Sequence, residues 1–111
     1  MPAKLWAPAG ASTSEFELVV CAAATTVLTV VVVGPPPEPG RGSGDAMPHM
    51  RVSVLDGPVL GFQGLVVGGS KRRSVYVGEF ELPDTAKPLQ ITLERYGTEA
   101  FTETAIAVQH D

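Results

Sequence analysis

The chain is poor in cysteine, which disulfide crosslinks require, and in histidine, which many catalytic sites use. Its 111 residues include one cysteine and two histidines. A single cysteine cannot form an internal disulfide, so nothing in the sequence indicates an oxidising compartment. Cys21 lies in an apolar stretch, where a thiol usually packs as a small hydrophobe. The expected location is therefore the cytoplasm or a virion, and the chain is not evidently secreted.

Positive charge is also scarce. Eight Lys and Arg residues stand against twelve Asp and Glu residues, giving a formal net charge of −4. Neutralising a phosphate backbone requires a basic face, so nucleic acid is not an expected partner. The one basic cluster consists of Lys71, Arg72 and Arg73, in the polar stretch GGSKRR. It predicts a charged hairpin tip that can meet an acidic patch on a partner protein.

Motifs for catalysis and metal binding are missing. The sequence contains no Cys-x-x-Cys, His-x-x-x-His or Asp-x-Asp-x-Asp spacing. His49 and His110 are far apart in the sequence, and the pair Glu79 and Glu81 is typical of a solvated strand face. The glycine-rich pieces begin no helix, so they lack the usual setting of a phosphate cradle. The sequence predicts no catalytic residue, no metal site and no cofactor, and hence no enzyme.

The apolar run from Phe16 to Val33 has two interpretations. Its length approaches the roughly 20 apolar residues that cross a bilayer as a helix. The run is crowded with valine and threonine, which lose side-chain freedom in a helix and pack well on a sheet. Acidic residues before the run and prolines after it also differ from the flanks of a typical span. We expect a β-hairpin with its turn at residues 22–25.

Further strand patterns follow this run, and no segment has a helical period. They are separated by turn residues and lie near 50–54, 59–67, 74–82, 89–93 and 101–109. About seven short strands predict an all-β fold. The preferred architecture is a single immunoglobulin-like β-sandwich, and the alternative is a small β-barrel.

The prediction divides the chain into an arm and a domain. Residues 1–14, interrupted by prolines and a glycine, are expected to form an extended N-terminal arm, and residues 15–111 the sandwich domain. The Pro/Gly-rich stretch 34–48 is expected to be a long loop of that domain. Leu5 and Trp6 are bulky apolar residues in the arm, and tryptophan is enriched among interface anchors. We expect both to contact a partner, the alternative being that Trp6 folds over an open end of the sandwich.

These features favour a non-catalytic structural or interaction protein that docks on a larger assembly. Small size, a single cysteine, acidic charge and an all-β pattern suit a component of a virus or bacteriophage particle, such as a head decoration or tail accessory subunit. The expected partner is a protein of that assembly, for example a capsid or tail protein, with self-association as a further contact. No membrane partner is expected.

Two other functions use different parts of the sequence. A small ligand-binding or enzymatic barrel would have Tyr76, Phe80 and Phe62 lining a cavity near Arg95 and His49. Such a site requires several inward polar groups, whereas the expected inward faces are mostly aliphatic. A membrane-anchored domain would instead use residues 16–33 as the span.

Overall fold

The computed structural model describes residues 5–8, 15–24, 26–35, 48–69, 72–83, 85, 87–95 and 98–108. These residues form strands, turns and loops and contain no helix. The strands are β1 (Leu5–Pro8), β2 (Glu17–Ala23), β3 (Val27–Gly34), β4 (His49–Val54), β5 (Phe62–Gly69), β6 (Ser74–Glu81), β7 (Leu89–Arg95) and β8 (Thr98–Ala107). The all-β prediction is confirmed. Residues 36–47 of the predicted Pro/Gly-rich loop lie outside the described residues.

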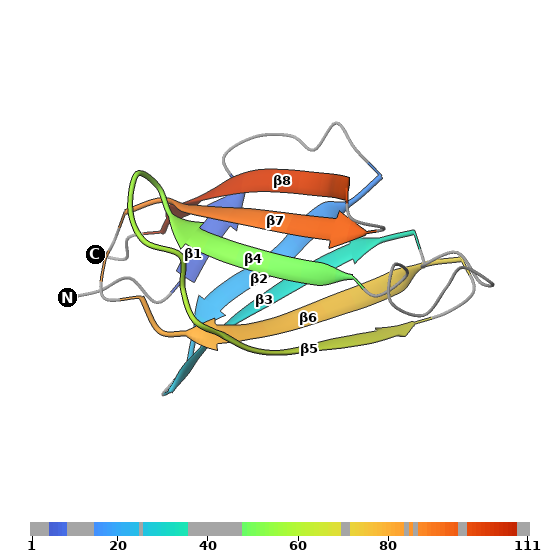
Figure 1. The fold of residues 1–111 in the computed structure, drawn as a ribbon, viewed down its shortest axis with the longest axis horizontal. Coiled ribbons are helices and arrows are strands. Elements are labelled where there is room, and N and C mark those ends of the chain that lie inside the picture. Colours follow the sequence, from blue (N-terminus) through green and yellow to red (C-terminus); the bar gives the residue numbers. More distant parts are fainter. Residues whose placement is uncertain are drawn as a thin grey trace.

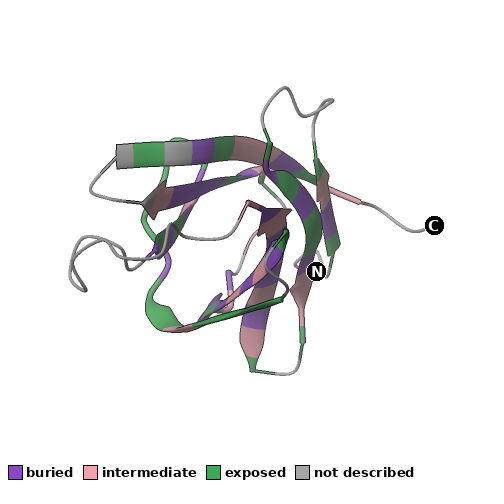
Figure 2. Cartoon of the chain, turned by 90° about the vertical axis from the view of Figure 1, so that its right-hand side faces the viewer, coloured by how far each residue is buried: buried purple, intermediate pink, exposed green. Residues whose placement is uncertain are grey.

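All eight strands belong to one antiparallel sheet. Their order is β4-β7-β8-β1-β2-β3-β6-β5 (Figure 1), so β4 and β5 are the two edge strands. Figure 2 shows the sheet curling back on itself, which brings its edges toward each other and makes it barrel-like. The arrangement supports the barrel alternative. It does not specifically support the immunoglobulin-like sandwich, because the strands form one continuous ladder and not two stacked sheets.

The seam between β4 and β5 is filled by the chain that connects them. The backbone N–H of Val54 donates to the Pro58 carbonyl at 2.9 Å, and that of Leu60 donates to the Val52 carbonyl at 2.8 Å. An isolated bridge joins Ser53 and Val59 between these two bonds. Residues 58–60 therefore cover the outer edge of β4 from Val52 to Val54, and the barrel is nearly closed without a ladder between β4 and β5.

The apolar run at 16–33 forms the predicted hairpin. β2 pairs antiparallel with β3, and Leu18 lies opposite Val32 before a β-bulge shifts the register. Residues of β3 alternate between buried and half-buried, as expected for valines on a pleated sheet. No helix among the described residues is long and apolar enough to cross a membrane.

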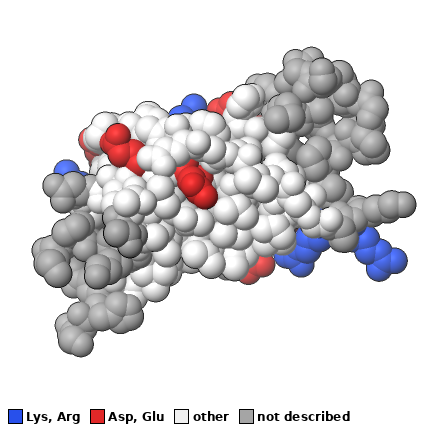
Figure 3. All heavy atoms as spheres, turned by 90° about the horizontal axis from the view of Figure 1, so that it is seen from below, with Lys and Arg blue, Asp and Glu red and all other residues white. Residues whose placement is uncertain are grey.

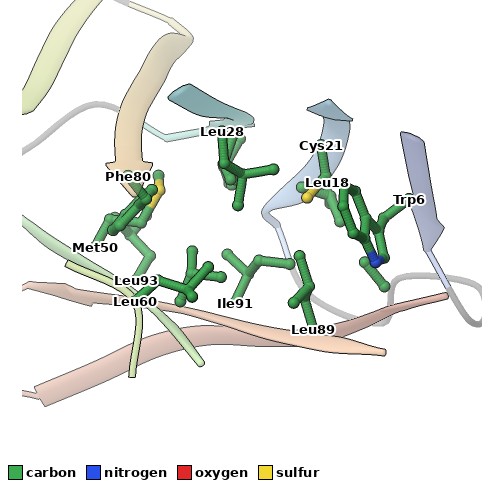
Figure 4. Packing of buried hydrophobic residues seen from close by; sticks show 14 of the residues in the cluster. Trp6, Leu18, Cys21, Leu28, Met50, Leu60, Phe80, Leu89, Ile91 and Leu93 are labelled. Atoms are coloured by element: carbon green, nitrogen blue, oxygen red, sulfur yellow. The ribbon is translucent and has the colours of Figure 1, made fainter. Parts of the chain in front are cut away.

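One hydrophobic core fills the inside of the curled sheet. Figure 4 shows side chains of β1, β2 and β3 facing those of β7 across the interior. Each fully buried aliphatic side chain contributes about 1.5–3 kcal/mol relative to an exposed one, so the core is the main source of stability. The largest fully enclosed side chains are Trp6, Tyr76, Phe80, Leu28, Leu89, Ile91, Leu93, Val30, Val32, Val52 and Cys21.

The N-terminal segment contains a strand that the sequence analysis did not predict. β1 pairs with β2 on one side and with β8 on the other, so the expected arm over residues 1–14 is corrected at Leu5–Pro8. Trp6 is only 2% exposed, and its indole N–H donates to the Lys87 carbonyl at 3.2 Å. Burying the large indole ring while its N–H keeps a partner favours this position. Trp6 is part of the core.

Replacing Trp6 with alanine tests this correction. We expect Trp6→Ala to lower the free energy of unfolding by about 3–5 kcal/mol, because it leaves a cavity in the core. Leu5→Ala is the matched control on the same strand, and its half-exposed side chain should cost less than about 1 kcal/mol. Urea denaturation measures both. If both substitutions lowered the free energy of unfolding by the same small amount, Trp6 would belong to an exposed arm and not to the core.

Two adjacent glycines at the end of β5 differ in whether the structure has room for a side chain at their position. Gly69 has a φ of 121°, and a Cβ there would overlap the carbonyl oxygen of Arg73, whereas a Cβ on Gly68 would meet no described atom within 4 Å. We expect Gly69→Ala to destabilise the chain by about 1–3 kcal/mol. Gly68→Ala should be neutral or stabilising by up to about 1 kcal/mol. Thermal unfolding of the two variants compares them directly, and equal melting temperatures would contradict the assigned turn geometry.

Candidate functional site

The predicted partner-contact residues lie in different environments. Trp6 is buried and presents no surface, whereas Leu5 is 38% exposed on the outer face of β1. Arg72 and Arg73 are exposed just before β6 begins, and the guanidinium of Arg73 lies 3.6 Å from the carboxylate of Glu17. Lys71 lies outside the described residues.

The structure does not bring Leu5 and the arginines together. Leu5 is opposite Ala22, and the same row of the sheet continues through Thr29 to Glu79. Arg72 and Arg73 instead precede Ser74, at the far end of β6. Their role as partner contacts stays a prediction, and the two groups do not form one surface.

Of the residues of the alternative barrel site, Tyr76 and Phe80 lie in the core, whereas Phe62 and His49 are exposed. Tyr76 and Phe80 are fully buried, and the Tyr76 hydroxyl donates to the Pro35 carbonyl at 2.6 Å. Phe62 is 58% exposed and touches Phe80 edge to face, with the ring centroids 5.8 Å apart. His49 is exposed, and the side chain of Arg95 is outside what the structure describes. Among the described residues, no three His, Cys, Asp or Glu side chains gather as a metal site would require.

The most unusual surface lies on β5. A strand that covers a core normally buries every second side chain, but no residue of β5 is fully buried. Phe62 and Val67 lie opposite Phe80 and Tyr76, on the inner face, and both remain exposed beside the seam. Val66 points outward and is 69% exposed.

Val66 is also the end of a row of valines on the outer face of the sheet. It lies opposite Val77 of β6, which is opposite Val31 of β3, which in turn is opposite Val20 of β2. Val20 and Val66 are exposed, and the two between them are half-buried. We call Val20, Val31, Val77 and Val66 the valine row. Apolar side chains that gather on one face of a sheet are candidates for contact with another chain.

The edge of β5 is uncovered, in contrast to the edge of β4. No described strand pairs with the outer side of β5. β5 also contains no charged residue and no proline, the features that usually protect an exposed edge from pairing with other chains. The sequence FQGLVVGG is therefore an apolar strand edge available for pairing.

Charges of opposite sign lie at the two ends of β5. Glu79 and Glu81, both exposed, are on the neighbouring strand near Phe62, where β5 begins. Arg72 and Arg73 lie near Gly69, where β5 ends. Figure 3 shows this side of the molecule, with acidic side chains over its middle and a group of basic side chains at the lower right. The uncharged β5 edge is thus flanked by acidic side chains near its beginning and by basic side chains near its end.

The sequence analysis missed this edge, although a signal for it is present. Residues 57–70 contain no charged side chain, which is uncommon for a strand at the edge of a sheet. The alternation in this stretch is interrupted by glycines, so neither the register of β5 nor its edge position could be derived from it. Comparison with known protein families, with curated proteins and with solved structures finds no match.

Cys21 is a free cysteine buried in the core, and its burial makes the free energy of unfolding depend on pH. Desolvation raises the pKa of its thiol from 9.0 to about 12. Above pH 9 the unfolded chain therefore releases this proton while the folded chain keeps it, so the free energy of unfolding falls as pH rises toward 12. The slope from this one group is about 1.4 kcal/mol per pH unit.

We expect the stability of the wild type relative to Cys21→Ala to be constant at neutral pH and to fall above pH 9. Urea denaturation of both proteins across this range isolates the thiol from other titrating groups. The thiol should also react with an aromatic disulfide reagent only as fast as the chain opens. Parallel stability curves and rapid labelling of the folded chain would show that Cys21 is accessible.

Proposed function

We propose that this chain is a non-catalytic structural or interaction protein that docks on other protein chains through β5 and the valine row. The carrying observation is the exposed, uncharged edge of β5, with Val66 at 69% exposure. A protein partner can use the edge in two ways. Its backbone can add a strand to β5, and its apolar side chains can cover the valine row.

The packed interior supports a role for the surface over a role for the barrel lumen. Small barrels either fill their interior with side chains or hold a ligand there. Here Leu28, Val52 and Ile91, from three strands around the barrel, are all fully buried in a single core. The packed interior therefore favours a binding site on the outer face of the sheet over one inside the barrel.

The specific assembly that we propose is a virus or bacteriophage particle, in which this chain is a head decoration or tail accessory subunit. Its support comes from the sequence: a chain of 111 residues with one cysteine and a net charge of −4. A small β-domain that adheres through one strand edge suits the repeated surface of such a particle. The chains that it contacts are then proteins of that particle: a capsid or tail protein, or another copy of this chain.

A photo-crosslinking amino acid at position 66 tests the proposal. The side chain of Val66 is replaced by p-benzoylphenylalanine, the protein is expressed in its native host, and adducts are identified by mass spectrometry. We expect a discrete adduct with a protein chain, recovered in a large assembly, because the probe projects from the proposed contact surface.

Ile106 provides the matched control for this probe. It is also β-branched, apolar and about half exposed, but it lies on β8, far from β5 in the sheet order. The same probe at position 106 should give little or no adduct. Absence of any adduct at position 66, or equal labelling at both positions, would refute a docking surface on β5.

A further inference from the structure

We infer that the partner of the β5 edge is β5 of a second copy of this chain, paired antiparallel with Val66 opposite Val66. This inference rests on the proposed function, since it names the chain that occupies the same surface. The resulting dimer has a two-fold axis perpendicular to the sheet and joins two curled sheets edge to edge.

The two edges of the sheet favour a symmetric dimer over a head-to-tail chain. Backbone groups of Val52 and Val54 on β4 are already bonded to Leu60 and Pro58. The outer edge of β4 from Val52 to Val54 is therefore not available to β5 of another copy. β5 is the edge strand that has no bonded chain along its whole outer side within the described sheet, so β5 meets β5, and the contact closes after two copies.

Side-chain chemistry selects the register. With Val66 opposite Val66, the outward side chains of both copies share one face, and the valine row continues across the dimer from Val20 of one copy to Val20 of the other. The same register pairs Leu65 with Val67, both on the inner face. A shift of one residue along one strand would pair inner with outer side chains and interrupt the row.

Charge selects the antiparallel direction. The end of β5 near Arg72 and Arg73 stays basic although Arg73 is paired with Glu17, and it then approaches the acidic end of the partner, near Glu79 and Glu81. A parallel pairing would place like charges side by side, which costs free energy. The strand itself carries no charge, so self-pairing buries no ionised group.

Sedimentation equilibrium of the purified chain tests self-association over a wide concentration range. We expect a monomer–dimer equilibrium in the wild type and a dissociation constant raised about tenfold or more by Val66→Lys, since a lysine on an edge strand opposes pairing. Ile106→Lys adds the same charge at an exposed apolar site and should leave the dimer intact. Circular dichroism checks that each variant is folded.

Disulfide trapping tests the register independently of the lysine variant. In a Cys21→Ala background, Val66→Cys should form a disulfide dimer under mild oxidation, because directly opposed Cβ atoms in a ladder are close enough to bridge. Ile106→Cys in the same background should remain largely monomeric. Equal trapping at both positions would indicate random collision and overturn the assigned pairing.

Charge reversal tests the direction. Arg72→Glu with Arg73→Glu should weaken the dimer, and adding Glu79→Arg with Glu81→Arg should restore it. Failure of the second pair of substitutions to restore the dimer would overturn the antiparallel arrangement.

The outcomes separate this inference from the proposed function. A wild type that stays monomeric at all concentrations, while the position-66 probe still labels a different protein, would overturn the homodimer and leave the docking function standing. A monomer with no adduct at position 66 would overturn both. A dimer insensitive to Val66→Lys would place self-association on another surface and refute the inference.

Discussion

The stability of this chain and the surface that we propose for docking both depend on how its single sheet closes. A sheet with eight strands and one apolar face must curl to bury that face, and curling brings β4 and β5 together. The edges are not joined by a ladder. Residues 58–60 bond to β4 instead, so β5 contributes to the wall of the core with only partly buried side chains and keeps an open edge.

The strands differ in how much they contribute to the core, and β5, which lies at the seam, contributes least. The seven strands other than β5 provide the inner residues of the core, including Ile91, Trp6 and Val30, which are essentially inaccessible to solvent. β5 adds little buried area, so its sequence is less constrained by packing. An apolar, uncharged strand at such a position is a liability for solubility unless another chain covers it, and this physical conflict is the basis of the proposed function.

Much of the fold could be predicted from the sequence, because its strands have strong local signals. The valines and threonines of 16–33 indicated a hairpin over a membrane helix, and β7 alternates clearly from Leu89 to Leu93. The closure of the sheet could not be predicted, since strand order depends on contacts between distant residues. β1 was missed because its four residues contain Pro8 and gain their stability from pairing with β2 and β8.

The candidate surface was less accessible to sequence reasoning than the fold. Leu5, Trp6 and the basic cluster were chosen for residue type, and tryptophan favours interfaces and cores equally well. Only the register shows that Trp6 points inward and Val66 outward. The uncharged stretch at 57–70 was a usable signal, but its meaning depends on β5 being an edge strand.

Amide hydrogen exchange, resolved by residue with NMR under conditions where the chain sediments as a monomer, tests the open seam most directly. Alternate amides of β5 should exchange rapidly, because they face the uncovered edge, while those directed at β6 are protected. The amide of Val54 should be protected by its bond to Pro58. Uniform protection along β5 in the monomer would mean that β4 and β5 form a closed ladder, and would contradict the account.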